Sequence, residues 1–499
     1  MGTKAGNVVQ VYIVYRDNLC LPLSWGTDRN GCSQRLYLFS VLRGQGEFIW
    51  AIEQAKPVLY MGINMKKNIK ICIGLLIIAG AILMVNKLLT YVLVDDAGDE
   101  VKYAMLKLYE QEDIETLFLG SSHVFCGYDP QTLDEIMGQN TYLAATPVQK
   151  VDGSYYLLKE VIKKNDIKTV YLDVYYRQYR DVPKERSDIQ MEYIYCITDN
   201  MQPGFNRIEF ILNASGPERY LEGLLVPSRY GNQLLDLQRF ERVVKSKRSG
   251  EYPYSGKPDN FYKGAMITLQ STGNPEMISK IGKFDLARIQ ENVISDYSLS
   301  YLDRIVSLCN EEGIELILVA TPLTDFHLAA MGNYDLYYDY MKAYARENNI
   351  EYYDFSLCRN EVLQLSRECF LDIHHLSGKG AVEYSKVFAN IMTNYDKEER
   401  EKFFYSSVEE KLAALPRQTF GIYLEEDEDT CFVGVAANYP IDAEYKIVSV
   451  DEEGNEIELI QDFSGESKFI VRKQNREWLK IVVREKKTGR ICEEGIIKL

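Results

Sequence analysis

A long apolar run constrains this chain more than any other feature. Residues 71–94, ICIGLLIIAGAILMVNKLLTYVLV, are interrupted only by Asn86 and Lys87. A helix of this length rises about 36 Å, enough to cross a hydrocarbon core of about 30 Å. The run is longer than the apolar part of a usual signal peptide, and no small-x-small cleavage site follows it cleanly. We therefore expect an uncleaved transmembrane anchor over residues 65–95, with a cleaved signal peptide as the alternative.

Charge on the two sides of the run predicts its orientation. Basic residues precede it and acidic residues follow it: Lys66, Lys67 and Lys70 on one side, and Asp95, Asp96, Asp99 and Glu100 on the other. Because positive flanks stay in the cytoplasm, the N-terminus is expected inside and everything after Asp95 outside. This pattern predicts a single-pass protein of a bacterial cell membrane with an extracellular domain.

Residues 1–64 do not fit this plan. They are polar and aperiodic, and they hold Trp25 and Trp50 ahead of Met65-Lys-Lys-Asn, which is typical of a translation start. We expect that they are a non-native extension and that translation begins at Met65; a disordered cytoplasmic tail is the alternative. N-terminal sequencing of natively expressed protein that found Met1 would contradict the first reading.

Composition excludes several classes of function. A net charge of −16, without a Lys/Arg-rich stripe, argues against a nucleic-acid binder. Ten cysteines without a Cys-x-x-Cys pair predict neither a disulfide scaffold nor a metal site, although Cys358 and Cys369 could pair outside the cell or stay as buried thiols. No phosphate-binding glycine-rich loop is present, and we expect no metal and no cofactor.

The region 96–400 alternates short apolar runs with amphipathic stretches, which predicts an α/β domain with a three-layer, flavodoxin-like parallel sheet. We expect strands at 116–120, 141–145, 169–175, 315–320 and 351–354. Helices are expected at 100–112, 130–137, 154–164, 299–312, 336–348 and 379–392. Residues 176–292 are rich in Tyr and Arg and break the pattern, which predicts a long insertion rather than further sheet strands.

From about residue 404 the pattern changes to strands and turns. Strands are expected at 419–424, 431–436, 444–450, 456–460, 468–472 and 479–484. We therefore predict a small accessory β-sandwich over residues 404–499, for which the sequence indicates no ligand.

Two motifs carry the groups needed for serine chemistry. The first, LFLGSSHVFCGYDP at 117–130, places Ser122 after a predicted strand, where α/β folds bind ligands. The second, FLDIHHLSGKG at 370–380, places Asp372 and His375 three residues apart before a helix. A serine hydroxyl becomes a nucleophile when an imidazole removes its proton, and that imidazole needs a carboxylate to fix its tautomer. Each motif alone is a weak signal, since a turn, a helix cap or a structural histidine would look the same.

Together the motifs resemble the SGNH hydrolase superfamily. Gly120-Ser121-Ser122 stands where its Gly-Asp-Ser block lies, and residues 372–376 (DIHHL) match its last block. The resemblance covers roughly residues 115–393 and is closest to the membrane-anchored branch that includes the teichoic acid D-alanylation protein and the alginate-type O-acetyltransferases. It implies that Ser122 is the nucleophile, His375 the base and Asp372 its orienting partner. Ser121 is the other possible nucleophile, but its side chain should point into the fold.

The sequence departs from that superfamily at the oxyanion hole. A glycine in the second block and an asparagine in the third are usual there, whereas residues 144–147 read AATP and residues 319–322 read VATP. The main-chain N–H of Ser122, assisted by those of His123 or Thr146, is expected to take over. Loss of one donor should slow the reaction about 10²–10³-fold. A slow transferase on a tethered substrate fits such a site better than a rapid esterase does, although a degenerate site would also fit.

Three functions follow from this sequence. The first is a membrane-anchored O-acyltransferase that passes an acetyl or similar group from an acyl-serine to a cell-surface polysaccharide or teichoic acid. The resemblance implies a multi-spanning membrane O-acyltransferase as its partner. The second is a surface esterase or deacetylase with water as acceptor. The third is a non-catalytic glycan-binding or assembly protein, in which the tyrosines of residues 175–180 (YYRQYR) would stack on sugars.

Overall fold

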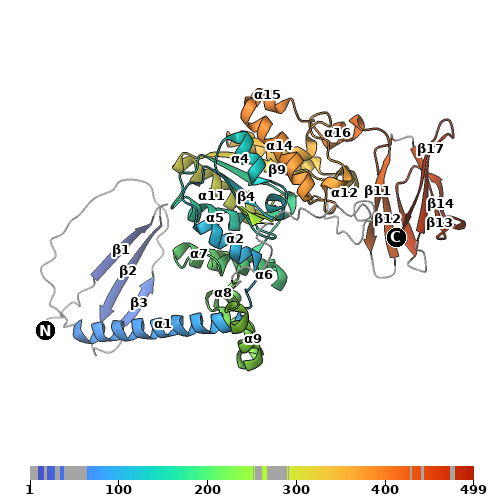
Figure 1. Cartoon of the computed structure of the whole chain (residues 1–499). Helices are drawn as coiled ribbons and strands as arrows, with labels where there is room; N and C mark the ends of the chain where they lie inside the picture. The colour runs from blue at the N-terminus through green and yellow to red at the C-terminus, as the bar shows by residue number, and fades with distance from the viewer. Residues whose placement is uncertain are drawn as a thin grey trace, which may run out of the picture. The chain divides into compact units, whose positions relative to one another are not determined.

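The computed structural model describes residues 9–15, 19–27, 34–38 and 65–499, except 251, 253–260, 267–288, 290–291, 427–429, 440–442, 473–477 and 499 (Figure 1). Within the N-terminal extension it has one antiparallel sheet of three strands, β1 (Val9–Tyr15), β2 (Leu19–Thr27) and β3 (Gln34–Leu38). The rest of residues 1–64 lies outside the described residues. That these residues are a non-native or disordered extension stays a prediction.

The predicted anchor is a single long helix, α1 (Met65–Leu93). Its part from Lys70 to Leu93 is long and apolar enough to cross a membrane, and most of its large apolar side chains are exposed. Exposed leucines and isoleucines along a whole helix are costly in water and favourable in lipid. The helix is thus consistent with a single-pass anchor near the N-terminus, and its orientation stays a prediction.

The last turn of α1 is attached to the domain that follows. In α9 (Leu237–Lys247), the Arg239 guanidinium donates to the carbonyl of Leu93 at 3.1 Å, and Lys247 Nζ donates to that of Tyr91 at 2.9 Å. Lys247 also pairs with Asp96 at 2.8 Å, and Asp96 pairs with Lys102 of α2 (Glu100–Tyr109). The carbonyls at the end of a helix lack partners within it and attract cations. These contacts therefore cap the helix and fix the short connection after it.

A parallel sheet of five strands forms the centre of the following domain, with the order β10-β9-β6-β4-β5. The strands are β4 (Thr116–Gly120), β5 (Thr141–Ala145), β6 (Thr169–Asp173), β9 (Glu315–Ala320) and β10 (Glu351–Asp354). In chain order this arrangement is 2-1-3-4-5, in which connections diverge between β4 and β6, and ligands of such folds bind at that point. All five predicted strands are confirmed, except that β6 ends at Asp173 and not at Tyr175.

Helices cover both faces of this sheet. On one face, Leu117 and Leu119 of β4 pack with α2, α5 (Val151–Val161), α11 (Asp296–Glu312) and α13 (Asp335–Glu347). On the other, Phe118 packs with α3 (Ser122–Phe125), α4 (Pro130–Met137) and α14 (Gly378–Asn394). Successive side chains of a strand point to opposite faces, so a fully apolar strand requires both helical layers. The predicted three-layer α/β architecture is confirmed.

The described part of the insertion is mainly helical. Its helices are α6 (Asp188–Thr198), α7 (Phe205–Ala214), α8 (Tyr220–Leu224) and α9, with 3-10 turns between them and one two-residue hairpin, β7 (Phe261–Tyr262) and β8 (Ala265–Met266). Arg186 attaches it to the core. Its buried guanidinium donates to Asp152 of α5 at 2.7 Å, to Asp181 at 2.7 Å and to the carbonyl of Ala214 at 2.6 Å.

The C-terminal region consists of two antiparallel sheets. The first contains β11 (Thr419–Glu426), β12 (Thr430–Ala437) and β15 (Lys468–Arg472); the second contains β14 (Glu456–Ser464), β13 (Ala443–Val450), β16 (Trp478–Glu485) and β17 (Ile491–Lys498). Ile422 and Val433 of the first sheet share a core with Ile447 and Ile481 of the second, so the sheets pack face to face. β17 was not predicted, because Glu493, Glu494 and Gly495 interrupt its apolar pattern.

Candidate active site

Ser122 lies where β4 ends and the short helix α3 begins. Ser121 before it is fully buried, as expected, whereas Ser122 is partly exposed. Gly120 makes the turn possible, because a Cβ there would lie 2.6 Å from both the Cβ of Asp173 and a methyl of Val124. The Gly-Ser-Ser sequence therefore places one serine in the core and the next at the carboxyl edge of the sheet.

The loop before α14 carries the other two groups. Phe370 and Leu376 pair across its base, and the N–H of Leu371 donates to the carbonyl of His375 at 2.8 Å. Within the loop, the Asp372 carboxylate accepts the main-chain N–H groups of His374 and His375, each at 2.8 Å. An aspartate that accepts from the next residues stabilises a tight turn. The carboxylate thus shapes the loop that presents the histidines.

Ser122, His375 and Asp372 form a continuous chain of hydrogen bonds. Ser122 Oγ lies 2.8 Å from His375 Nε2, and His375 Nδ1 lies 2.7 Å from Asp372 Oδ2. An ionised carboxylate only accepts, so Nδ1 carries the proton and donates to Asp372. The Nε2 lone pair then accepts the hydroxyl proton of Ser122. This is the geometry needed for an imidazole to remove a proton from a serine.

The charge of Asp372 is stabilised in place. Burial alone would raise the pKa of this carboxyl, but hydrogen bonds and charge from His374 and His375 outweigh burial and hold the pKa well below its usual range. Asp372 is therefore ionised at any physiological pH. An anion beside the imidazole favours the charged imidazolium that forms when His375 accepts a proton.

The other three histidines, His123, His327 and His374, also lie close to His375, which the sequence did not predict. His374 Nδ1 lies 2.9 Å from Asp372 Oδ1, and His123 Nδ1 lies 3.0 Å from Thr321 Oγ1. The ring centroid of His327 lies 6.1 Å from that of His374. Burial lowers the pKa values of His123, His327 and His374, which favours the neutral form of each side chain. All four histidines of the chain thus lie in one region. The sequence did contain one signal for this cluster, because His374 and His375 are adjacent in a single motif.

The tyrosines after β6 belong to the packing around this region. Tyr175 packs against His123 with ring centroids 3.8 Å apart, and the Tyr176 hydroxyl lies 3.2 Å from His327 Nε2. Tyr175, Tyr176 and Tyr179 are all buried. Buried rings cannot stack on a polymer, so these three tyrosines do not form the expected sugar-binding surface.

Donors for an oxyanion are present at the start of α3. Ser122 and His123 are its first two residues, and their N–H groups have no acceptor within the helix or elsewhere in the part of the chain that the structure describes. Free N–H groups at a helix start suit a developing negative charge. Thr146 follows β5 and is buried, with its hydroxyl 3.1 Å from Gln149 Oε1. Residues 144–147 include the end of β5, which pairs with β4, whereas residues 319–322 include the end of β9, which β6 separates from β4.

Cys358 and Cys369 remain free thiols and are buried. The thiol of Cys369 lies 3.2 Å from Glu383 Oε2 of α14. The disulfide considered from the sequence is therefore not formed in the structure.

Gly380 at the start of α14 is needed for the Asp-His loop. A Cβ there would lie 2.0 Å from the carbonyl oxygen of Cys369, a backbone atom that cannot rotate away. We expect Gly380→Ala to cost about 1–3 kcal/mol and to slow covalent labelling of Ser122 by a fluorophosphonate, because the loop must shift. Gly465→Ala, which meets no atom within 4 Å, is the control. Wild-type melting temperature and labelling rate in Gly380→Ala would contradict this.

The buried carboxyl of Asp173, at the end of β6, should make the stability of the fold depend on pH. Burial raises its pKa from 3.8 to about 7, although N–H groups of Thr321 and Tyr175 partly oppose this. Between about pH 4 and 7 the folded protein keeps a proton that the unfolded chain has lost, so rising pH destabilises the fold. The free energy of unfolding of Asp173→Asn, relative to that of the wild type, should therefore rise by roughly 2–4 kcal/mol from pH 4 to pH 8. Urea unfolding at both pH values measures this gain; a gain as small as that of the exposed Asp166→Asn would refute it.

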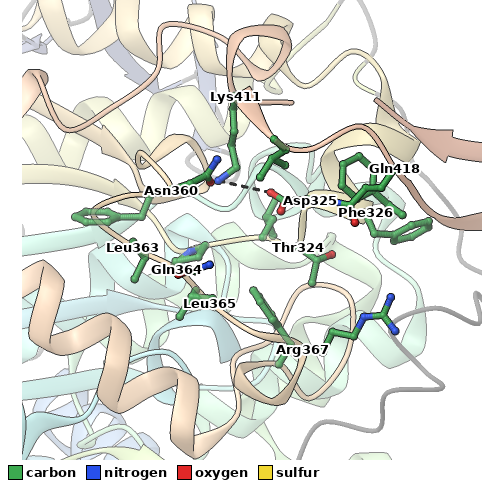
Figure 2. Close-up of a pocket in the computed structure, with 16 residues that line it drawn as sticks. Thr324, Asp325, Phe326, Asn360, Leu363, Gln364, Leu365, Arg367, Lys411 and Gln418 are labelled. Atoms are coloured by element: carbon green, nitrogen blue, oxygen red, sulfur yellow. Dashed lines mark ion pairs between the residues drawn. The ribbon is translucent and has the colours of Figure 1, made fainter. Parts of the chain in front are cut away.

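A hollow of about 260 Å³, shown in Figure 2, has the base of the Asp-His loop in its lining. Its lining includes Thr324 and Phe326, Phe370 at the loop base, and Lys411, whose ammonium lies 3.6 Å from a carboxylate oxygen of Asp325. Thr324 Oγ1 donates to the carbonyl of Ile373 at 2.7 Å. None of Ser122, Asp372 and His375 lines this hollow, so it does not contain the nucleophile.

The fold and the site define an α/β domain with a Ser-His-Asp hydrogen-bond chain at the carboxyl edge of its sheet. A family model without a functional description matches residues 277–396. No curated protein matches the sequence. Among solved structures, an engineered protein is 12% identical, with 81% of this chain and 97% of its own covered, at a TM-score of 0.18. Such a similarity carries no argument, so function is argued from the site.

Proposed function

We propose that this protein is a membrane-anchored serine acyltransferase that modifies hydroxyl groups of a cell-surface polysaccharide or teichoic acid. The observation that carries the proposal is the hydrogen-bond chain from Ser122 through His375 to Asp372 at the carboxyl end of β4. The resemblance of both motifs to the membrane-anchored SGNH branch, and the long apolar helix α1, support this class of substrate.

The reaction has two balanced steps. Ser122 Oγ attacks the carbonyl of the donor while His375 Nε2 takes its proton, and the N–H groups of Ser122 and His123 stabilise the oxyanion. The leaving group receives that proton, and the acyl group remains as an ester on Ser122. In the second step an acceptor hydroxyl gives its proton to His375 and attacks the ester, and His375 returns that proton to Ser122 Oγ as the acyl–serine bond breaks. A multi-spanning membrane O-acyltransferase would supply the acyl group from the cytoplasm.

The accessibility of the site favours a large acceptor. The His375 and Asp372 side chains are 22% and 23% exposed, and Ser122 is partly exposed, so a polymer can approach without entering a deep cavity. The same exposure admits water, which makes a surface esterase or deacetylase the second candidate. The two differ only in which hydroxyl resolves the acyl-serine.

Trapping of the intermediate tests the proposal. The full chain in detergent is treated with p-nitrophenyl acetate, quenched in acid and digested, and the acetylated peptide is fragmented to separate Ser121 from Ser122. We expect acetyl on Ser122 alone, none in Ser122→Ala, and faster loss of the ester with oligosaccharide acceptors than with water. Equal loss in both conditions would favour the esterase, and the absence of any adduct would favour a non-catalytic protein.

A further inference from the structure

We propose that His123, His374 and His375 bind a zinc-class divalent cation that separates His375 from Ser122 and thereby inhibits the enzyme. The binding follows from the arrangement of the three imidazoles alone. The inhibition rests on the proposed function, because it requires His375 to be the base.

The three imidazoles are close enough to share one ion. One ring nitrogen from each lies within 4.8 Å of the others. Four-coordinate zinc holds its nitrogen ligands at about 2.0–2.1 Å, which places them about 3.4 Å apart, so modest side-chain rotations complete the site. Imidazole is a preferred ligand of zinc, copper and nickel, and three ligands leave the fourth position open.

Nδ1 of each ring already has an oxygen partner, as the second nitrogen of a metal-binding histidine usually does. Nδ1 of His374 and of His375 lie 2.9 and 2.7 Å from the two oxygens of Asp372, and Nδ1 of His123 lies 3.0 Å from the Thr321 hydroxyl. Metal-binding histidines usually donate their second N–H to an oxygen, which fixes the tautomer and the ring orientation. Here that pattern leaves the Nε2 lone pairs for an ion, with the Asp372 charge behind two of them.

His123 provides an independent sign of a missing ligand. Its side chain is buried, with the residue only 2% exposed, and its Nε2 has no hydrogen-bond partner in the described part of the protein. A buried nitrogen without a partner costs free energy, which a coordinated cation would recover. His327 also has a buried ring nitrogen without a partner, Nδ1, but its Nε2 lies 3.2 Å from the Tyr176 hydroxyl and it is outside the group of three.

Binding must disturb catalysis, because the ion and Ser122 compete for one lone pair. The Nε2 atom of His375 accepts the Ser122 hydroxyl at 2.8 Å. Once this atom coordinates a cation, it can no longer remove the serine proton. Removal of the metal restores the hydrogen bond, so the effect is reversible.

Cobalt and zinc titrations of the full chain in detergent test the proposal. After treatment with EDTA and its removal, Co²⁺ is added and the visible absorption of four-coordinate cobalt is followed; Zn²⁺ affinity is then measured by displacement. We expect one ion per chain, and at least about 100-fold weaker zinc binding in His123→Gln and in His374→Gln. His327→Gln is the matched control and should keep wild-type affinity.

Fluorophosphonate labelling of Ser122 provides the second readout. Zn²⁺ should block labelling of the wild type, EDTA should restore it, and His374→Gln should resist zinc relative to its own metal-free rate. Because His123 is buried, the more exposed His374 keeps the test valid if His123→Gln fails to fold. Absent cobalt absorption, or equal affinity in His374→Gln and wild type, would overturn the site. Binding without a block of labelling, or with a faster reaction, would overturn the inhibition alone.

Discussion

Replacement of Asp372 by asparagine should lower the rate of Ser122 acylation about 10⁴-fold while the protein stays folded. The carboxylate holds the proton of His375 on Nδ1, at 2.7 Å, and so leaves Nε2 free to accept from Ser122. An asparagine amide in that position donates to Nδ1 and selects the other tautomer, in which Nε2 carries a proton and cannot act as a base. The charge that stabilises the imidazolium is lost as well.

The rate of p-nitrophenol release during the first turnover measures this effect. Asp166→Asn, at a side chain 87% exposed, is the matched control and should react like the wild type. A melting temperature close to that of the wild type would separate catalysis from folding. If Asp372→Asn acylates within tenfold of the wild type, Asp372 does not orient the base.

Arg186→Met should cost about 3–5 kcal/mol, because it leaves two carboxylates buried without their cation. Asp152 and Asp181 both accept from the Arg186 guanidinium, and all three side chains are almost completely buried. Burial alone would lower the pKa of Arg186, but the charges of Asp152 and Asp181 outweigh burial and raise it. The loss should release the insertion from α5 before the central sheet unfolds.

Urea-dependent proteolysis of the full chain measures where and when the insertion opens. Arg219→Met breaks an exposed pair with Asp188 at 2.7 Å and should cost less than about 1 kcal/mol. Addition of Asp152→Asn and Asp181→Asn to Arg186→Met should recover much of the stability, since no unpaired charge remains. Failure of the triple variant to recover would show that Arg186 acts through packing instead.

The long apolar helix and the five central strands were predictable because their signals are local. Apolar runs of five or six residues, buried on both faces, identify strands such as 116–120 without knowledge of their neighbours. The insertion was not predictable in detail. Its helices lie against the core through contacts such as Arg186 with Asp152, which are 34 residues apart and follow no periodic pattern.

Ser122, Asp372 and His375 lie together as the sequence predicts. Asp372 and His375 are only three residues apart, the first motif follows a strand, and the second precedes a helix. Residues 372–375 contain two histidines, and the loop geometry decides that His375, and not His374, reaches Ser122. The contact between His123 and Thr321 could not be predicted in this way. The turn after β4 places His123, and the end of β9 places Thr321. Proximity of this kind appears only when strands from distant parts of the chain are placed side by side.

The contacts of Arg239 and Lys247 with the end of α1 limit how far the domain that follows can move from this helix. Only six residues separate α1 from α2, and Asp96 among them is held by two lysines. A long flexible linker would let the domain search a wide volume around its attachment point, at a low local concentration of any one acceptor. In the membrane-anchored acyltransferase that we propose, a stiff connection would instead keep Ser122 at a constant height above the lipid. Polymer chains would then be modified in a narrow band next to the membrane, as they are built or pass by.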